Sequence, residues 1–219
     1  MTDGILLIDK PTEMTSFGVV ARVRRVLTQA ANKKVKVGHT GTLDPFATGL
    51  MILVIGKECK NAGHYSKLDK VYEATIHLGQ TSTTGDPEGE LTDVSDKQPT
   101  GGDVNDALAQ FTGDIQQRPP IFSAIKIDGQ RAYKLARDGK EVVIPERTVT
   151  IHSLELVDYT YPELKIRTHV SSGTYIRTLA SDIGEVLGTG AYCTGLRRTS
   201  ISKWSIADAQ LLSDLGVTD

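Results

Sequence analysis

The chain has 219 residues, of which 39% are hydrophobic and 24% are charged, and its formal net charge is −2. This composition is that of an ordinary globular protein, and the net charge alone gives no sign of a nucleic-acid partner. The two cysteines lack CxxC spacing, which argues against a disulfide scaffold and against a thiolate zinc site. No signal peptide is evident, and no apolar run approaches the ~20 residues of a membrane span. We therefore expect a single domain over residues 1–219, located in the cytoplasm.

Charge is distributed unevenly along the chain. Residues 1–60 carry nine Lys and Arg against five Asp and Glu, residues 61–120 carry four against ten, and residues 121–219 carry twelve of each. The first and last segments can therefore form a basic face toward RNA, with the acidic middle segment turned away. On charge alone, a mixed solvated surface is the simpler interpretation.

The first quarter of the chain predicts a strand, a helix and a second strand. Residues 4–8 form an apolar run that ends shortly before a proline, which predicts a buried strand. Thr15 or Ser16 can then cap a helix whose apolar residues recur at helical spacing. Residues 51–55 are apolar throughout and predict another buried strand. The apolar face of the helix consists of Val19, Val20, Val23, Val26 and Leu27.

The remainder of the chain predicts mostly short strands and a few helices. Residues 70–79 alternate in polarity, as a half-buried strand does. A short amphipathic helix follows near residues 104–111 and ends at Gly113, and a longer one begins near Ser172 and runs to about Leu187. The other expected elements are strands at 121–127, 142–144, 148–158 and 164–170, a helix at 131–138, a final hairpin with strands at 192–196 and 199–204, and a helix at 206–212 capped by Ser205.

The most informative stretch is the loop at residues 38–50. It contains one carboxylate, one imidazole, three threonines and three glycines in 13 residues. Because it leads directly into the apolar run 51–55, core packing can hold the loop while its side chains stay open to a ligand. Asp44 precedes a proline, which biases its backbone toward extended geometry. From the residues alone, an ordinary turn with an Asx side chain is the simpler interpretation.

This loop reads G-H-T-G-T-L-D-P-F-A-T-G and resembles the catalytic motif of the TruB-type tRNA pseudouridine synthases. The likeness extends over nearly the whole chain, from about residue 4 to about residue 212. It implies that Asp44 is the nucleophilic aspartate, that Tyr72 lies against the target base, and that Tyr175 and Arg177 belong to the active site. The other matching stretches are Lys10-Pro11, K-x-Y at 70–72, the polar loop 79–89, S-A-x-K at 123–126, G-T-Y-I-R at 173–177 and L-R-R-T at 196–199.

The resemblance also implies a fold and a substrate. The expected fold is α+β, with a long mixed, mostly antiparallel sheet flanked by helices and a central RNA-binding cleft. The expected reaction is isomerisation of a uridine to pseudouridine at position 55, in the TΨC stem-loop of tRNA. We expect no cofactor, no metal, no membrane association and no obligatory protein partner. Bacterial members commonly carry a C-terminal RNA-binding PUA domain, which we expect this chain to lack.

Four further residues have two interpretations each. Lys10 either contacts the substrate or serves turn chemistry. His39 either holds flipped bases or a phosphate, or braces the loop. Leu196 either forms an apolar wall of the pocket or is a core leucine. Asp86 lies near the substrate in the family, but its surroundings in the sequence favour an Asx-turn role.

The reaction breaks the N1–C1′ bond of uridine, turns the uracil and rejoins it through C5. Attack of Asp44 at C1′, attack at C6 and proton abstraction at C2′ all stay open. We hypothesise that Arg177 pairs with Asp44 and favours its ionised form. Arg177→Lys should then cost activity, because an ammonium cannot replace a planar guanidinium fork. Tyr72 offers a stacking surface for the flipped base, and Tyr175 packs beneath it or shapes the pocket.

Two other functions compete with a stand-alone synthase. The first is an RNA-binding or tRNA-folding module in which catalysis is secondary. The second is a synthase that modifies other RNAs within a larger particle. A folding module would not need the carboxylate, so the presence of Asp44, Tyr72, Tyr175 and Arg177 together favours the enzyme.

Overall fold

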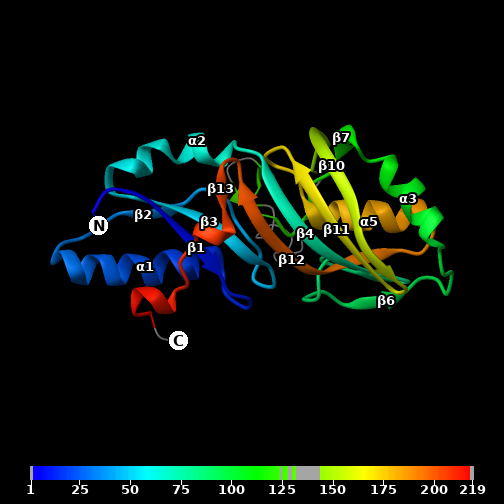
Figure 1. The fold of residues 1–219 in the computed structure, drawn as a ribbon, viewed down its shortest axis with the longest axis horizontal. Coiled ribbons are helices and arrows are strands. Elements are labelled where there is room, and N and C mark those ends of the chain that lie inside the picture. The colour runs from blue at the N-terminus through cyan, green and yellow to red at the C-terminus, as the bar shows by residue number, and fades with distance from the viewer. Residues whose placement is uncertain (1, 124, 128–129, 132–143, 218–219) are drawn as a thin grey trace. The chain divides into compact units, whose positions relative to one another are not determined.

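The computed structural model describes residues 2–123, 125–127, 130–131 and 144–217 (Figure 1). The chain divides into two compact units, of which unit 1 comprises Met1–Tyr72 with Arg197–Asp219 and unit 2 comprises Glu73–Leu196. The chain passes between the units within two strands, β4 (Lys70–Leu78) and β12 (Ala191–Ile201).

Unit 1 is built on β3 (Thr48–Ile55), an apolar strand that is buried at every residue but the first. β1 (Gly4–Lys10) pairs antiparallel with β3 along its whole length, and β2 (Val37–His39) pairs antiparallel with the end of β3. The last part of β12 joins the start of β3 in parallel, and β13 (Trp204–Ser205) returns antiparallel to β12. The segment between β2 and β3 is therefore fixed at both ends by strand pairing.

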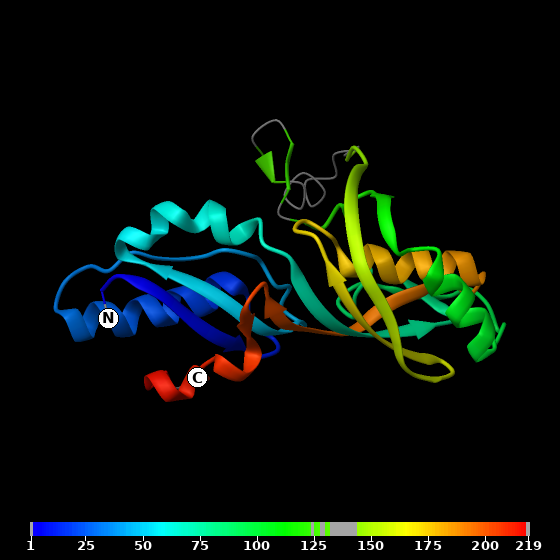
Figure 2. The same cartoon turned by 45° about the horizontal axis from the view of Figure 1, so that its top comes forward.

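The main helix of unit 1 is α1 (Ser16–Ala31), which lies beside β2 (Figures 1 and 2). It begins at Thr15, whose hydroxyl accepts a hydrogen bond from the Gly18 amide at 2.9 Å. It ends at Asn32, which has left-handed geometry. A cluster centred on Leu50, Ile52 and Ile201 forms part of the core. The smaller helices are η1 (Gly56–Asn61), α2 (Ala62–Ser66), η2 (Ile206–Asp208) and η3 (Ser213–Leu215).

Unit 2 contains the strand order β12, β4, β11, β10, β7. The pairs of β10 with β11 and with β7 are both antiparallel. Two helices, α3 and α5, contact each other in this unit (Figure 2). The elements are β7 (Gly113–Gln117), β10 (Arg147–Thr160), β11 (Glu163–Val170), α3 (Gly101–Ala109), α5 (Ile176–Leu187), and the small hairpins of β5 (Gln80–Ser82) with β6 (Leu91–Asp93) and β8 (Lys126–Ile127) with β9 (Gln130–Arg131).

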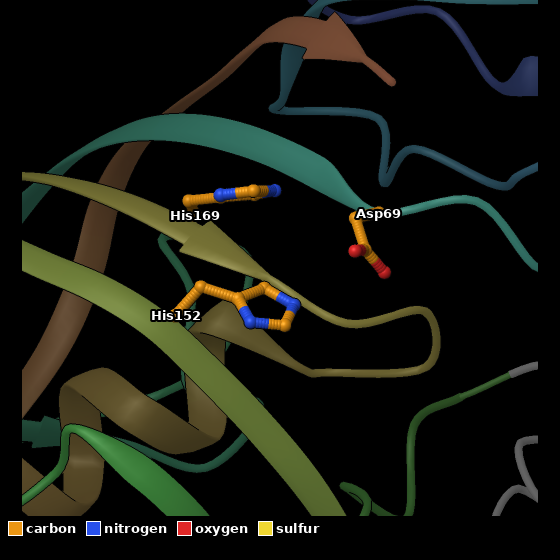
Figure 3. Close-up of side chains that lie close together, drawn as sticks. All are labelled: Asp69, His152 and His169. Carbon is orange, nitrogen blue, oxygen red and sulfur yellow. The ribbon is translucent and has the colours of Figure 1, made fainter.

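A bulge in β10 brings two histidines of unit 2 together. The register of β10 against β11 shifts between Ile151 and Ser153, as it does where a strand carries an extra residue. The ring of His152, at this bulge, lies 4.7 Å from the ring of His169 on β11 and is tilted by 47° (Figure 3). A structural zinc site takes four protein ligands, so two imidazoles by themselves do not define one.

The predicted architecture is confirmed. The structure is α+β with a mixed sheet that contains several antiparallel strand pairs and the parallel pair of β12 with β3. The predicted strands at 4–8, 51–55, 70–79, 148–158 and 164–170 are present, as are the helices now labelled α1, α3 and α5. None of the helices described here is long and apolar enough to cross a lipid bilayer.

Several predicted boundaries are wrong. The two strands expected at 192–196 and 199–204 are replaced by one continuous strand, β12, as far as Ile201, and the reversal into β13 occurs later, at Ser202, which has a positive φ of 49°. The helix α3 ends at Ala109, and Gly113 begins β7 instead of ending the helix. Only Lys126–Ile127 of the expected strand 121–127 is a strand, and the last expected helix is reduced to η2. The predicted helix at 131–138 and strand at 142–144 lie largely outside the described residues.

Candidate active site

Asp44 lies on the segment of unit 1 between β2 and β3, and the residues on each side of it are tied down. The Ser16 hydroxyl donates to the Leu43 carbonyl at 2.9 Å and accepts from the Leu43 amide at 2.8 Å. The Lys10 ammonium donates to the Pro45 carbonyl at 3.1 Å. Asp44 itself is half-buried, and its carbonyl accepts from the Ala47 amide at 3.2 Å. The carboxylate therefore stands on a loop with a fixed backbone while part of the residue stays exposed.

Lys10 is fully buried beneath this loop. Its ammonium donates to the carbonyls of Pro11, Met14 and Pro45, at 2.8, 2.5 and 3.1 Å. Burial, together with repulsion from Arg198, lowers the pKa of Lys10 to about 8. Attraction by the Asp44 carboxylate opposes this shift. These contacts match the turn interpretation of Lys10, and its role in substrate binding stays a prediction.

Arg198 is a buried cation that the sequence analysis did not single out, although it lies in the L-R-R-T stretch. Only 1% of this residue is exposed. Its guanidinium donates from Nε to the Leu50 carbonyl at 2.7 Å and from Nη2 to the Gly41 carbonyl at 3.2 Å. Nη1 lies 3.5 Å from the phenol oxygen of Tyr72. Arg198 thus connects the loop that carries Asp44 with β3 and β4.

Tyr72 and His39 both belong to unit 1. Tyr72 is on β4 and is 7% exposed. His39 is half-buried at the end of β2, opposite Leu53. Near Tyr72, the Lys70 ammonium donates to the carbonyls of Ser66 and Leu68. Burial, together with repulsion from the Arg198 guanidinium, lowers the pKa of Lys70 to about 8, while the Asp69 carboxylate opposes the shift.

Arg177 begins the helix α5 in unit 2 and is 4% exposed. Its Nη1 donates to Asp86 Oδ2 at 2.9 Å and to the Thr84 carbonyl at 2.7 Å, and its Nη2 donates to the Phe122 carbonyl at 2.8 Å. Asp86 also accepts from the Thr84 hydroxyl at 2.6 Å and from the Glu88 amide at 3.1 Å. Asp86 therefore has the predicted turn role and a second role as an ion-pair partner. The pairing of Arg177 with Asp44 stays a prediction.

Tyr175 precedes α5 and is held by a residue that sequence reasoning missed. The side-chain oxygen of Gln117 accepts from the Tyr175 amide at 2.8 Å, and its nitrogen donates to the Tyr175 carbonyl at 3.1 Å. The guanidinium of Arg147 lies 5.1 Å from the centre of the Tyr175 ring and donates to the Gly173 carbonyl. Nothing in the residue type of Gln117 signals this role, because its partner lies 58 residues away in the chain. Leu196 is half-buried in β12.

The α+β fold and the tethered aspartate fit the class of pseudouridylate synthases, and the family comparison agrees. Residues 24–176 match the TruB family pseudouridylate synthase (N terminal domain). The tRNA pseudouridine synthase B of Opitutus terrae is 46% identical over 211 residues, which cover 96% of this chain and 86% of that protein. The protein of the same name from Corynebacterium jeikeium is 42% identical over 222 residues, covering 97% of this chain and 70% of that protein. The chain belongs to the TruB family of pseudouridylate synthases.

The fold is also similar to a solved structure. A chain in the crystal structure of a Cbf5-Nop10-Gar1 complex superposes with a TM-score of 0.75 at 28% identity. The match covers 97% of this chain and 53% of that one, so this chain spans about half the length of the matched chain.

Proposed function

We propose that this chain isomerises the uridine at position 55 in the TΨC loop of tRNA to pseudouridine, with Asp44 as nucleophile or base. Membership of the TruB family makes the chain an isomerase of the tRNA pseudouridine synthase class. The observation that carries the assignment of Asp44 is the loop itself, because the backbone on both sides of a half-exposed carboxylate is fixed by Ser16 and Lys10. A reacting group needs such positioning to be effective.

The electrostatics of unit 1 support an ionised Asp44. Its carboxylate and the buried Lys10 ammonium attract each other, and this attraction opposes the lowering of the Lys10 pKa by burial. The same attraction favours the carboxylate form of Asp44, which is the form required of a nucleophile or a base. Attack at C1′, attack at C6 and proton abstraction at C2′ each use that form.

The target base has to leave its stack before Asp44 can reach it, at a cost of a few kcal/mol. We assign the stacking surface for the flipped base to Tyr72, at about 1–3 kcal/mol per base. Arg177, Tyr175, His39 and Leu196 complete the proposed substrate site. The proposed substrate is the TΨC stem-loop, bound without an obligatory protein partner. We place the enzyme in the cytoplasm, as expected for a tRNA-modifying enzyme whose relatives are bacterial.

Release of hydrogen from C5 tests the reaction. C5 becomes the glycosidic carbon, so tRNA labelled with tritium at C5 of uridine should lose label with the wild-type protein. A matched transcript with cytidine at position 55 tests the position and should release none. Asp44→Asn should release no tritium and still bind the RNA, because the change removes one negative charge from a site for a polyanion. Refolding of tRNA without tritium release would instead identify an RNA-folding module.

A further inference from the structure

We propose that Arg198 is a positioning residue for the isomerisation. The proposal rests on the proposed function of Asp44 and Tyr72, and it adds a residue that holds both of them. Arg198 does not need to touch the substrate, since all its recorded partners are groups of unit 1.

The guanidinium of Arg198 joins three segments that are far apart in the sequence. Its donors reach Leu50 on β3, Gly41 on the Asp44 loop and Tyr72 on β4, over separations of 148, 157 and 126 residues. A planar fork with fixed N–H directions holds its three acceptors in one defined geometry, which an ammonium on a flexible stem does not reproduce. Arg198 therefore sets the distance between the loop and the Tyr72 phenol.

The contact with Tyr72 also determines which way the phenol proton points. A phenol has a single O–H donor. Because Arg198 donates to the Tyr72 oxygen, the proton of Tyr72 is directed away from Arg198. A correctly aimed phenol can stack against the base or assist proton transfer from C5 in one fixed orientation.

The close approach of β3 to β12 fixes the backbone at Arg198. Gly49 pairs with Arg198 in the parallel register of β3 and β12. It has a φ of +108°, and a Cβ at this position would lie 2.3 Å from the Arg198 carbonyl oxygen. Glycine at this motif position therefore allows the two backbones to pair where Arg198 begins its side chain.

The charge balance indicates that Arg198 is not present for stability. Among the described residues, its hydrogen bonds go to two carbonyls and a phenol and to no carboxylate. It also lowers the pKa of both Lys10 and Lys70, so it adds repulsion to a region that already contains two buried ammonium groups. Burying a cation among neutral partners is costly, and an apolar residue would avoid that cost. The gain that offsets the cost is the fixed geometry of the loop and Tyr72.

The test compares Arg198→Lys with Arg197→Lys in the tritium-release assay. Arg197 is the neighbouring arginine, it is partly exposed, and it pairs with Asp9 at 2.7 Å. We expect Arg198→Lys to lower kcat by roughly 10²-fold, the effect of a misplacement of about 1 Å, while KM changes less than about threefold. Arg197→Lys should leave kcat within about twofold. Tyr72→Phe should lower kcat by a smaller factor in the Arg198→Lys protein than in the wild type. The reason is that both substitutions remove the same contact between Arg198 and Tyr72.

Wild-type kcat in a folded Arg198→Lys protein would overturn the proposal. A raised KM with an unchanged kcat would overturn it as well, because that pattern indicates that only uniform substrate binding was lost. If Arg198→Lys does not fold, Arg198→Gln provides the second variant, since its amide keeps a hydrogen-bond donor at this position without the guanidinium fork. We expect a folded Arg198→Gln protein to lower kcat by about tenfold or more with KM little changed, and an unchanged kcat would overturn the proposal. Absence of tritium release from the wild type would reject the proposed function itself, which separates the two failures.

Discussion

Among the residues that the structure describes, each unit buries one arginine, and the two arginines are held in different ways. Arg198 in unit 1 and Arg177 in unit 2 are 1% and 4% exposed, and each donates to two backbone carbonyls. The third recorded partner differs, because Arg177 bonds to the Asp86 carboxylate and Arg198 to the Tyr72 phenol. A buried guanidinium can therefore be accommodated with a carboxylate at hydrogen-bond distance or with neutral acceptors only.

The difference follows from what surrounds each arginine. Asp86 stands in a turn whose own amides and hydroxyls stabilise the carboxylate, so an ion pair can form at little additional cost. Arg198 instead lies among buried lysines, and the carboxylates that act on those lysines, Asp44 and Asp69, influence them through space. In unit 2 the charge of Arg177 is neutralised locally, whereas in unit 1 Arg198 repels the buried ammonium groups of Lys10 and Lys70, which Asp44 and Asp69 attract. The comparison predicts that single substitutions act more strongly in unit 2 when they remove a charge.

The largest effect on stability is expected from Asp86→Ala. Removing one partner of a buried ion pair leaves the other charge in a low-dielectric environment, so the free energy of unfolding should fall by about 4 kcal/mol. Urea unfolding at pH 7 measures it. Glu88→Ala is the matched control, because Glu88 is exposed in the same turn and only its amide contacts Asp86, and it should change the free energy by less than about 0.5 kcal/mol. Equal effects of the two substitutions would mean that the ion pair contributes nothing.

The next largest effect on stability is expected from Gly49→Ala, which we compare with Gly85→Ala. Gly49 lies beside Arg198, and Gly85 lies beside Arg177. Gly49→Ala should cost about 3 kcal/mol, because its φ of +108° is strained for alanine and the new Cβ meets the Arg198 carbonyl at 2.3 Å. Gly85→Ala should cost only about 1 kcal/mol. Gly85 has a φ of +73°, and its Cβ would lie 3.5 Å from the Arg177 Cβ, an ordinary contact. Urea unfolding of both variants tests the ranking, and the reverse order would contradict the tight approach of β3 to Arg198.

The sequence predicted Arg177 and missed the role of Arg198 for a physical reason. Arg177 lies in the first turn of a helix with a clear apolar stripe, and the sequence led to the hypothesis of an ion pair with Asp44, which stays a prediction. The structure shows an ion pair of Arg177 with Asp86, which the sequence analysis did not propose. The partners of Arg198 are two carbonyls and one phenol from three distant segments, and backbone carbonyls leave no trace in residue type. A motif can therefore show that a position matters without showing what it contacts.

The wrong prediction of the final hairpin has a related cause. Local pattern suggested a turn between Leu196 and Thr199, but Arg197 and Arg198 are needed in extended geometry to pair with β3. Tertiary pairing overrides local turn preference there. The chain reverses only after that pairing is complete, at Ser202. The helices α1 and α5, which have strong apolar periodicity and clear ends, were predicted correctly because their signals are local.

The buried lysines of unit 1 predict a pH dependence at alkaline pH. Burial lowers the pKa of Lys70 from 10.5 to about 8, so between these values the unfolded chain binds more protons than the folded one. The free energy of unfolding should therefore rise as pH increases from about 8 to about 10.5. Lys70→Met should flatten this rise, while Lys67→Met, at an exposed position nearby, should leave it unchanged. Denaturant unfolding at several pH values checks the slope, and a wild-type slope in Lys70→Met would contradict it.

The smallest effect is expected in unit 2 and has the opposite direction. Asp182 of α5 lines a groove with Glu146 and Glu185, and burial together with repulsion from Glu185 raises its pKa from 3.8 to about 6. Between these values the folded chain binds more protons than the unfolded one, so the free energy of unfolding should fall as pH rises from about 4 to about 6.

Asp182→Asn should remove that fall, because the amide cannot ionise. Asp106→Asn, on the exposed face of α3, serves as the control and should retain it. The measurement is urea unfolding in steps between pH 4 and 7. If the slope persists in Asp182→Asn, another group of the chain carries it. If the slope disappears, Asp182 of unit 2 is the group that lowers the free energy of unfolding as the pH rises from about 4 to about 6. The buried lysines of unit 1 instead raise the free energy of unfolding as the pH rises from about 8 to about 10.5. The two units would then differ in the sign of their pH response as they differ in how their arginines are balanced.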